Sequence, residues 1–101
     1  MRIIATRVLR EYWQKFPDTE QHLKAWMGEV KAADWTQPAD IKAKYLSASI
    51  LKNRRVVFNI KGNGYRLVVS VAYRFGSVYI KFIGTHEQYD AIDSETIEME
   101  V

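Results

Sequence analysis

The hydrophobic pattern of this 101-residue chain changes period near Arg55, and this change constrains the fold more than any other feature. Before it, apolar residues recur three and four positions apart, as on one face of a helix. After it, apolar and polar residues alternate, as along a strand with one buried face. A sheet with one apolar face needs a second layer to cover it, and the preceding amphipathic helices can supply that layer. The sequence therefore predicts an α+β fold.

Two long helices and one short helix are expected before the change of period. Apolar side chains fall on one stripe in each of the segments 6–16 and 18–35. Asp18, with a glutamine three residues later, matches a capping box that begins the second helix, and the break at Pro17 makes the two helices a hairpin. Pro38 is expected to open the short third helix.

Three strands joined by tight turns are expected after the change of period. They span residues 55–60, 65–74 and 78–84. Asn63-Gly64 is a strong hairpin signal between the first two. We expect a small antiparallel sheet whose apolar face packs on the helical hairpin. Residues 2–5 can add a short strand, and all of residues 1–101 are expected to form one domain.

The charges are strongly segregated along the chain. Residues 1–40 hold six basic and six acidic side chains, residues 41–86 hold nine basic and no acidic ones, and residues 87–101 hold six acidic and no basic ones. A basic surface of this extent favours a polyanionic ligand such as nucleic acid, because each neutralised phosphate releases counterions. The alternative is that these residues form an ordinary solvated face of the sheet.

Composition argues against several classes of protein. The chain has no cysteine, so neither a disulfide framework nor a cysteine-based zinc site is available to it. Two histidines with scattered carboxylates do not match a zinc signature, and we expect no metal and no cofactor. No apolar stretch resembles a signal peptide or is long enough to span a bilayer, so we expect a cytoplasmic protein without a membrane partner.

A polar cluster follows the last predicted strand. Thr85 and Gln88 match a capping box that begins a short C-terminal helix. His86 then takes the first helical position, beside the unpaired amide groups. Asp90, four residues later, shares the face of His86, and Tyr89 adjoins them. Because a histidine can accept and donate protons at neutral pH, these side chains are candidates for a proton-transfer site.

If the polyanion is RNA, this cluster has the groups that backbone cleavage requires. Attack by the 2′-hydroxyl needs a base, the leaving 5′ oxygen needs an acid, and the added negative charge needs fixed donors. His86 and Tyr89 can divide the proton transfers. Arg66, expected with Arg74 on the polar side of the middle strand, can grip two phosphate oxygens, and Lys81 on the next strand adds positive charge.

Each of these residues also has a plain structural interpretation. A single histidine after a strand is often a solvated or capping residue. Tyr89 can be a packing residue, and Arg66 and Lys81 can be ordinary outward-facing side chains.

The acidic end of the chain, residues 95–101, has two interpretations. It can fold back over the basic sheet and mask it, or it can form a frayed, solubilising tail. We expect the frayed tail.

Two sheet motifs carry a family resemblance. The stretches RRVVFNIKGNGYRLVV and VYIKFIGTHEQYDAID, with RVLREYWQKFPDTEQHLKAW and WTQPADIKAKY before them, closely resemble the HigB-type toxins of bacterial type II toxin–antitoxin modules, a branch of the RelE-like superfamily. The resemblance implies a RelE-like fold and an endoribonuclease that cuts translated mRNA on the ribosome. It also implies that a HigA-like antitoxin with a helix-turn-helix neutralises the toxin. The toxin is then expected to reach operator DNA only through this antitoxin.

The family pattern also indicates which residues carry the activity. It matches this sequence at Arg66, His86, Tyr89 and Asp90, and we expect the first three to be catalytic. The supporting or RNA-binding residues are expected to be Lys81, Asp90, Arg74, Arg55, Arg54 and Lys61. The alternative function is a non-catalytic toxin or RNA-binding module of the same fold, such as the gyrase-inhibiting ParE branch, which inhibits its target by contact.

Overall fold

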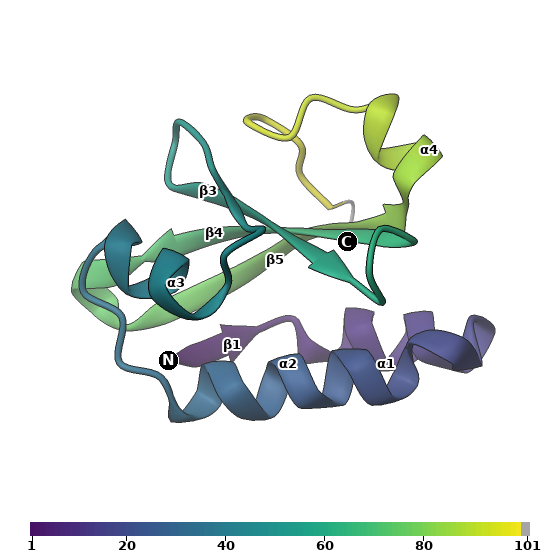
Figure 1. Ribbon diagram of the computed structural model, residues 1–101, viewed down its shortest axis with the longest axis horizontal. Coiled ribbons are helices and arrows are strands. Elements are labelled where there is room, and N and C mark those ends of the chain that lie inside the picture. Colours follow the sequence, from purple (N-terminus) through teal and green to yellow (C-terminus); the bar gives the residue numbers. More distant parts are fainter. Residues whose placement is uncertain (100–101) are drawn as a thin grey trace.

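The computed structural model describes residues 1–99. A twisted sheet separates two long helices from residues 91–99, called here the C-terminal segment (Figure 1). The helices are α1 (Thr6–Lys15), α2 (Glu20–Ala32), α3 (Pro38–Lys44) and α4 (His86–Asp90), with single 3-10 turns η1 (Pro17–Thr19) and η2 (Tyr73–Phe75). The strands are β1 (Arg2–Ile4), β2 (Ser49–Ile50), β3 (Arg55–Ile60), β4 (Tyr65–Ala72) and β5 (Ser77–Thr85). The predicted α+β class, the helical hairpin and the short C-terminal helix are confirmed.

The sheet has five strands in the order β1-β5-β4-β3-β2. The expected meander of β3, β4 and β5 is present, and β2 extends it with another antiparallel pair. The expectation of a purely antiparallel sheet is wrong, because β1 pairs with β5 in parallel, with Arg2 opposite Ser77. The chain leaves β1 through the helices and returns to the far edge of the sheet, so the first and last strands become neighbours.

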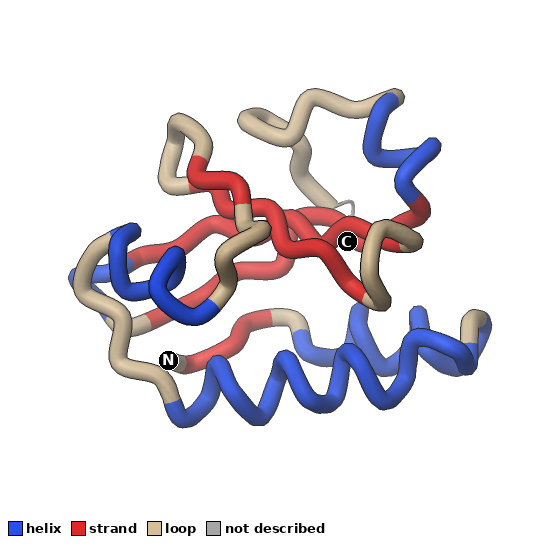
Figure 2. Tube along the Cα trace, viewed as in Figure 1, coloured by secondary structure: helices blue, strands red, loops and turns tan. Residues whose placement is uncertain are grey.

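The helix side of the sheet forms the main core. Figure 2 shows α1 and α2 lying against one face of the strands. Apolar residues of α1 and α2 are buried there: Leu9, Leu23, Trp26, Met27 and Val30. They pack with alternate residues of β3, β4 and β5: Val56, Phe58, Ile60, Leu67, Val69, Val71, Val78 and Ile80. Full burial of such a side chain contributes about 1.5–3 kcal/mol, so this face supplies most of the driving force for folding.

The opposite face of the sheet, called here the open face, is covered only by α4 and the segment after it among the described residues (Figures 1 and 2). Val57 and Val68 alternate with the helix-side residues and are still 3% and 0% exposed. The C-terminal segment therefore buries part of the open face.

Three local expectations differ from the structure. The middle strand ends at Ala72, so Arg74 lies in η2 and not in the strand. The turn after β3 is present, but the residues with positive φ are Lys61 and Gly62 rather than Asn63 and Gly64. In α2 the N-cap residue makes no side-chain capping bond, so the predicted capping box is wrong.

Asp18 has a tertiary role in place of the expected cap. Its Oδ2 atom accepts hydrogen bonds from Lys61 Nζ and Tyr65 OH, both at 2.9 Å. The bond from Lys61, followed by the bond from Tyr65, lowers the pKa of the Asp18 carboxyl below its ordinary value. These contacts tie the β3–β4 turn to η1.

Candidate active site at the end of the last strand

The start of α4 is fixed by the capping box that the sequence predicts. Thr85 Oγ1 accepts a hydrogen bond from the Gln88 amide at 3.2 Å, and Gln88 Oε1 accepts one from the Thr85 amide at 2.9 Å. His86 is the first residue of the helix, and its own amide donates to the Gly64 carbonyl at 3.2 Å. The backbone of His86 is therefore held between the end of β5 and the β3–β4 turn.

Gly84 makes room for this arrangement. A Cβ atom at this position would lie 2.6 Å from Phe82 Cζ and 2.7 Å from Gln88 Oε1. The Gln88 side chain, which completes the capping box, therefore packs directly against the backbone of residue 84. This is possible because glycine has no Cβ atom.

Arg66 lies beside the start of α4. It is paired with Gly84 in the β4–β5 register, two residues before His86. Its Nη1 atom donates to the Asn63 carbonyl at 3.0 Å, and its Cζ atom lies 6.0 Å from the centre of the Tyr89 ring. The backbone bond and the cation–π contact hold the guanidinium at one corner of the open face.

His86 and Asp90 complete the corner. Their Nδ1 and Oδ1 atoms are 3.7 Å apart across one turn of α4, and their side chains are 53% and 62% exposed. A carboxylate at this distance limits the orientations of the ring. The structure thus places Arg66 against Tyr89, and His86 beside Asp90, at the junction of β4 and α4, and their catalytic role stays a prediction.

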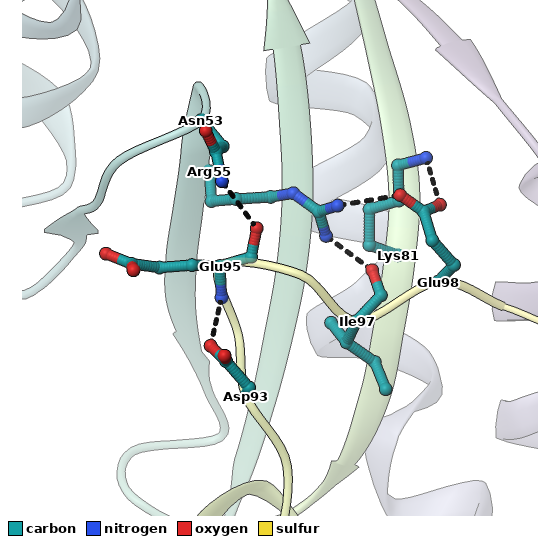
Figure 3. A network of polar contacts seen from close by, with 7 residues as sticks. All are labelled: Asn53, Arg55, Lys81, Asp93, Glu95, Ile97 and Glu98. Atoms are coloured by element: carbon teal, nitrogen blue, oxygen red, sulfur yellow. Dashed lines mark hydrogen bonds and ion pairs between the residues drawn. The ribbon is translucent and has the colours of Figure 1, made fainter.

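Lys81 and Arg55 form a second group on the open face. Val68 pairs with Phe82 and Val69 with Ile80, which leaves Lys81 without a paired residue on β4. Lys81 keeps the alternation of exposed Tyr79 with buried Val78 and Ile80, and the bulge shifts the alternation only after it. Figure 3 shows Lys81 and Arg55 converging on one carboxylate, that of Glu98.

Three predicted RNA-binding residues do not join the corner. Arg74 is exposed in η2, at the opposite end of β4 from Arg66. Lys61 is paired with Asp18 at the helix side. Arg54 is exposed in the β2–β3 turn with φ of 58°, and it lines a hollow near Arg55 and Lys81.

The expectation of a frayed acidic tail is wrong for residues 95–99, and residues 100–101 lie outside the described residues. Arg55 donates to the Ile97 carbonyl at 2.6 Å and to Glu98 Oε1 at 2.7 Å (Figure 3). Lys81 donates to Glu98 Oε2 at 2.6 Å. Glu98 was not among the predicted site residues, although the alternation of Ile97, Glu98 and Met99 is a weak sign of a segment with one buried face.

These contacts change the chemistry of Glu98. The hydrogen bond from Lys81 is the main cause that lowers the pKa of the Glu98 carboxyl below its ordinary value, with Arg55 adding to it. The carboxylate is therefore ionised at neutral pH, and it pairs with two basic residues of the open face and offsets one of their two positive charges.

The corner around Arg66 offers a fixed cation, an imidazole and a phenol on adjoining elements. General acid–base catalysis at a phosphodiester requires such a set, with the cation placed where negative charge develops. Among residues 1–99, no group of three or more histidine, cysteine or carboxylate side chains is placed to hold a metal ion. Within the same residues, the longest helix is too short and too polar to cross a bilayer.

Comparison with known proteins points to one family. The family model HigB_toxin, described as the RelE-like toxic component of a toxin–antitoxin system, matches residues 19–92. The chain is 28% identical over 92 residues to the mRNA interferase toxin HigB of Escherichia coli K12 and to the mRNA interferase HigB of Shigella flexneri, covering 89% of this chain and 88% of each relative. It is 22% identical over 94 residues to an mRNA interferase HigB of Escherichia coli O6:H1, covering 91% of both.

The matched region contains β2 to β5 and α4, and with them every residue of the corner around Arg66. Because the match covers more than half of the chain, this protein belongs to the HigB toxin family, the RelE-like toxic components of toxin–antitoxin systems.

Proposed function

We propose that this protein is an mRNA interferase, the endoribonuclease toxin of a type II toxin–antitoxin module. Relatives that match it over nearly their whole length carry the name mRNA interferase. The single observation that carries the proposal is the corner of the open face where Arg66 of β4 lies over Tyr89 of α4, the helix that His86 begins. This corner combines phosphate binding with proton transfer.

The proposed reaction is transfer of the phosphoryl group to the neighbouring 2′-hydroxyl. The bond from the 2′ oxygen to phosphorus forms while the bond to the 5′ oxygen breaks, which leaves a 2′,3′-cyclic phosphate and a 5′-hydroxyl. One of His86 and Tyr89 accepts the 2′ proton, and the other protonates the leaving oxygen. Arg66 stabilises the negative charge that builds on the phosphoryl oxygens, and Asp90 orients His86.

We further propose that the ribosome presents the mRNA to this site. The side chains of His86 and Asp90 are more than half exposed, so the protein alone neither excludes water from them nor holds the reacting part of an RNA strand rigidly against them. Catalysis gains from both, and a ribosome docked against the basic surface supplies them.

The proposed protein partner is a HigA-like antitoxin with a helix-turn-helix, and the toxin reaches operator DNA only through it. Membership of a toxin–antitoxin family supports an antitoxin partner in general. The proposed location is the cytoplasm, where translated mRNA is found.

Cleavage of a defined mRNA on purified translating ribosomes tests the proposal, with cut sites mapped by primer extension. Arg66→Ala and His86→Ala should each lower the cleavage rate on the order of 100-fold or more, because each removes a group that acts on the reacting phosphate. Arg10→Ala and His22→Ala are matched controls, since each removes the same type of side chain from an exposed helix position outside the corner and outside the basic stretch 41–86. Both controls should cleave at the wild-type rate.

The same variants separate cleavage from inhibition by contact. Cells that express Arg66→Ala or His86→Ala should survive, while ribosome affinity is retained. Toxicity that persists in both variants without mRNA cleavage would overturn the proposal and favour a toxin that acts by binding.

A further inference from the structure

Arg55 and Lys81 hold an anion in a built site. Arg55 is 5% exposed and the Lys81 side chain 21% exposed, whereas the Glu98 side chain that joins them is 62% exposed. Each carboxylate oxygen of Glu98 accepts one hydrogen bond from a cation: Oε1 accepts from Arg55, and Oε2 accepts from Lys81 (Figure 3). The two basic residues are fixed by the sheet, and the acidic one reaches them from the surface.

The surroundings of this pair suit a larger anion than a carboxylate. A hollow of about 690 Å³ adjoins it, and the hollow is lined by Asn53, Arg54 and Ser70 as well as by the two cations and the C-terminal segment. A phosphate has two free oxygens on one centre, as a carboxylate has, and arginine binds both groups in the same way. Glu98 therefore occupies the position that a phosphate would take.

We propose that Arg55 and Lys81 form a subsite for an RNA backbone phosphate, and that Glu98 closes this subsite in the free protein. The inference rests on the proposed function for the identity of the ligand as RNA. The C-terminal segment is then an internal competitor, which RNA must displace before it can lie across the open face.

The position of the subsite fits a phosphate that flanks the cleaved one. Arg55 is opposite Ser70 in the β3–β4 register, four residues along β4 from Arg66. Four residues of a strand span roughly 13 Å. A single RNA strand that reaches Arg66 can therefore place a neighbouring phosphate, and not the reacting one, between Arg55 and Lys81.

The ligand is RNA rather than an acidic protein segment because of the charge around the site. Arg55, Lys81, Arg66 and Arg54 lie in the 46-residue stretch 41–86, which contains nine basic and no acidic residues. The carboxylates that line the hollow beside Arg55 and Lys81 come from the C-terminal segment alone. A pair of cations on the same sheet face as the cation–imidazole corner matches a polyphosphate chain better than a few separated carboxylates.

The segment is held in place by more than the ion pairs. Asn53 donates to the Glu95 carbonyl at 3.2 Å, and Met99 packs against the hydrophobic core beside α1. Glu98 is therefore tethered near its partners at a high effective concentration, which is why one carboxylate can compete with RNA.

Binding of a non-cleavable, 2′-O-methylated single-stranded RNA, followed by fluorescence anisotropy, tests the inference. Glu98→Gln should bind the RNA about three- to tenfold more tightly than wild type, because the Glu98 carboxylate no longer competes for the two cations. Glu95→Gln is the matched control: it removes the same charge from the same segment, and its side chain makes no ion pair among the described residues. Because Glu95 lines the hollow without pairing with a cation, the control should gain clearly less RNA affinity than Glu98→Gln.

A double-mutant cycle identifies the subsite. In a Lys81→Gln background, Glu98→Gln should raise RNA affinity less than it does in the wild type, because one of the two cations is gone. Equal affinity of Glu98→Gln and wild type, or an equal gain in Glu95→Gln, would overturn the inference. It would also be overturned if only an acidic peptide, and not the RNA, bound the Glu98→Gln variant more tightly.

The two proposals fail in different ways. If Glu98→Gln binds RNA more tightly but no mRNA is cleaved, the proposed reaction is wrong and the subsite stands. If mRNA is cleaved and Glu98→Gln has no effect on affinity, the subsite is wrong and the reaction stands.

Discussion

At the scale of single residues, Asp18 links the helical side of the protein to the turn that positions Arg66. It accepts hydrogen bonds from Lys61 and Tyr65 of the β3–β4 hairpin, and Arg66 donates to Asn63 in the same turn. Because the folded protein lowers the pKa of Asp18, its carboxylate stabilises the fold above the ordinary pKa near 3.8. This stabilisation is lost as the pH falls through the lowered value.

Replacement of Asp18 should therefore change the pH dependence of stability. Asp18→Asn should melt at a lower temperature than wild type at pH 7, and the difference should shrink as the pH falls below 3.8. Thermal unfolding followed by circular dichroism at a series of pH values measures this. Asp34→Asn, at an exposed position, should melt like the wild type throughout. A melting difference that stays constant down to the acid limit would contradict this role.

Single residues also show what local sequence can and cannot predict. The Thr85–Gln88 capping box depends on four consecutive residues, so the sequence identifies it and the structure confirms it. Asp18 has the same local pattern, but its carboxylate is bound by Lys61 and Tyr65, 43 and 47 residues away. A local sequence pattern does not show that residues far away in the sequence will bind the carboxylate in place of the helix amide groups.

At the scale of elements, the junction of β5 and α4 depends on Gly84. A Cβ atom there would displace Gln88 Oε1, which lies 2.7 Å from its position, and break the hydrogen bond to the Thr85 amide. Gly84→Ala should lower the free energy of unfolding by about 1 kcal/mol or more, because a capping bond is lost. It should also slow mRNA cleavage, since His86 begins α4.

Chemical denaturation and the ribosome cleavage assay measure both effects. Gly28→Ala is the control, because Gly28 lies within α2 and nothing stands within 4 Å of its missing Cβ. That substitution should raise the free energy of unfolding by roughly 0.5–1 kcal/mol and leave cleavage unchanged. Unchanged stability and cleavage in Gly84→Ala would contradict the role given to this junction.

Elements differ in how far their pairing could be predicted. The strands β3, β4 and β5 follow from period-two alternation and short turns, both of which are local. The parallel pairing of β1 with β5 and the docking of residues 95–99 join segments far apart in sequence, and neither has a strong local signal. The bulge at Lys81 shifts the β4–β5 register, so alternation alone could not show which residues of β5 lie near Arg66.

At the scale of the whole molecule, the segregated charges should dominate RNA affinity. The logarithm of the binding constant for single strands falls with the logarithm of salt concentration, with a slope of about −0.7 per neutralised phosphate. With Arg66 on one phosphate and Arg55 with Lys81 on another, the slope should be about −1.4 or steeper.

Anisotropy titrations of the non-cleavable RNA between low and physiological salt measure this slope. Arg66→Ala should make it shallower by about 0.7, the contribution of one phosphate. A wild-type slope near zero would show that the basic face binds no polyanion, and the protein would then be a contact inhibitor or a structural protein.

The central claim is that Arg66 and His86 act on one reacting phosphate, and single-turnover cleavage of ribosome-bound mRNA by the two single variants and the double variant tests it most directly. Groups that act as a unit are strongly non-additive, so Arg66→Ala with His86→Ala should be far less impaired than the product of the two single losses. If the two losses multiply fully, or if either single variant cleaves at the wild-type rate, the two residues do not share a site.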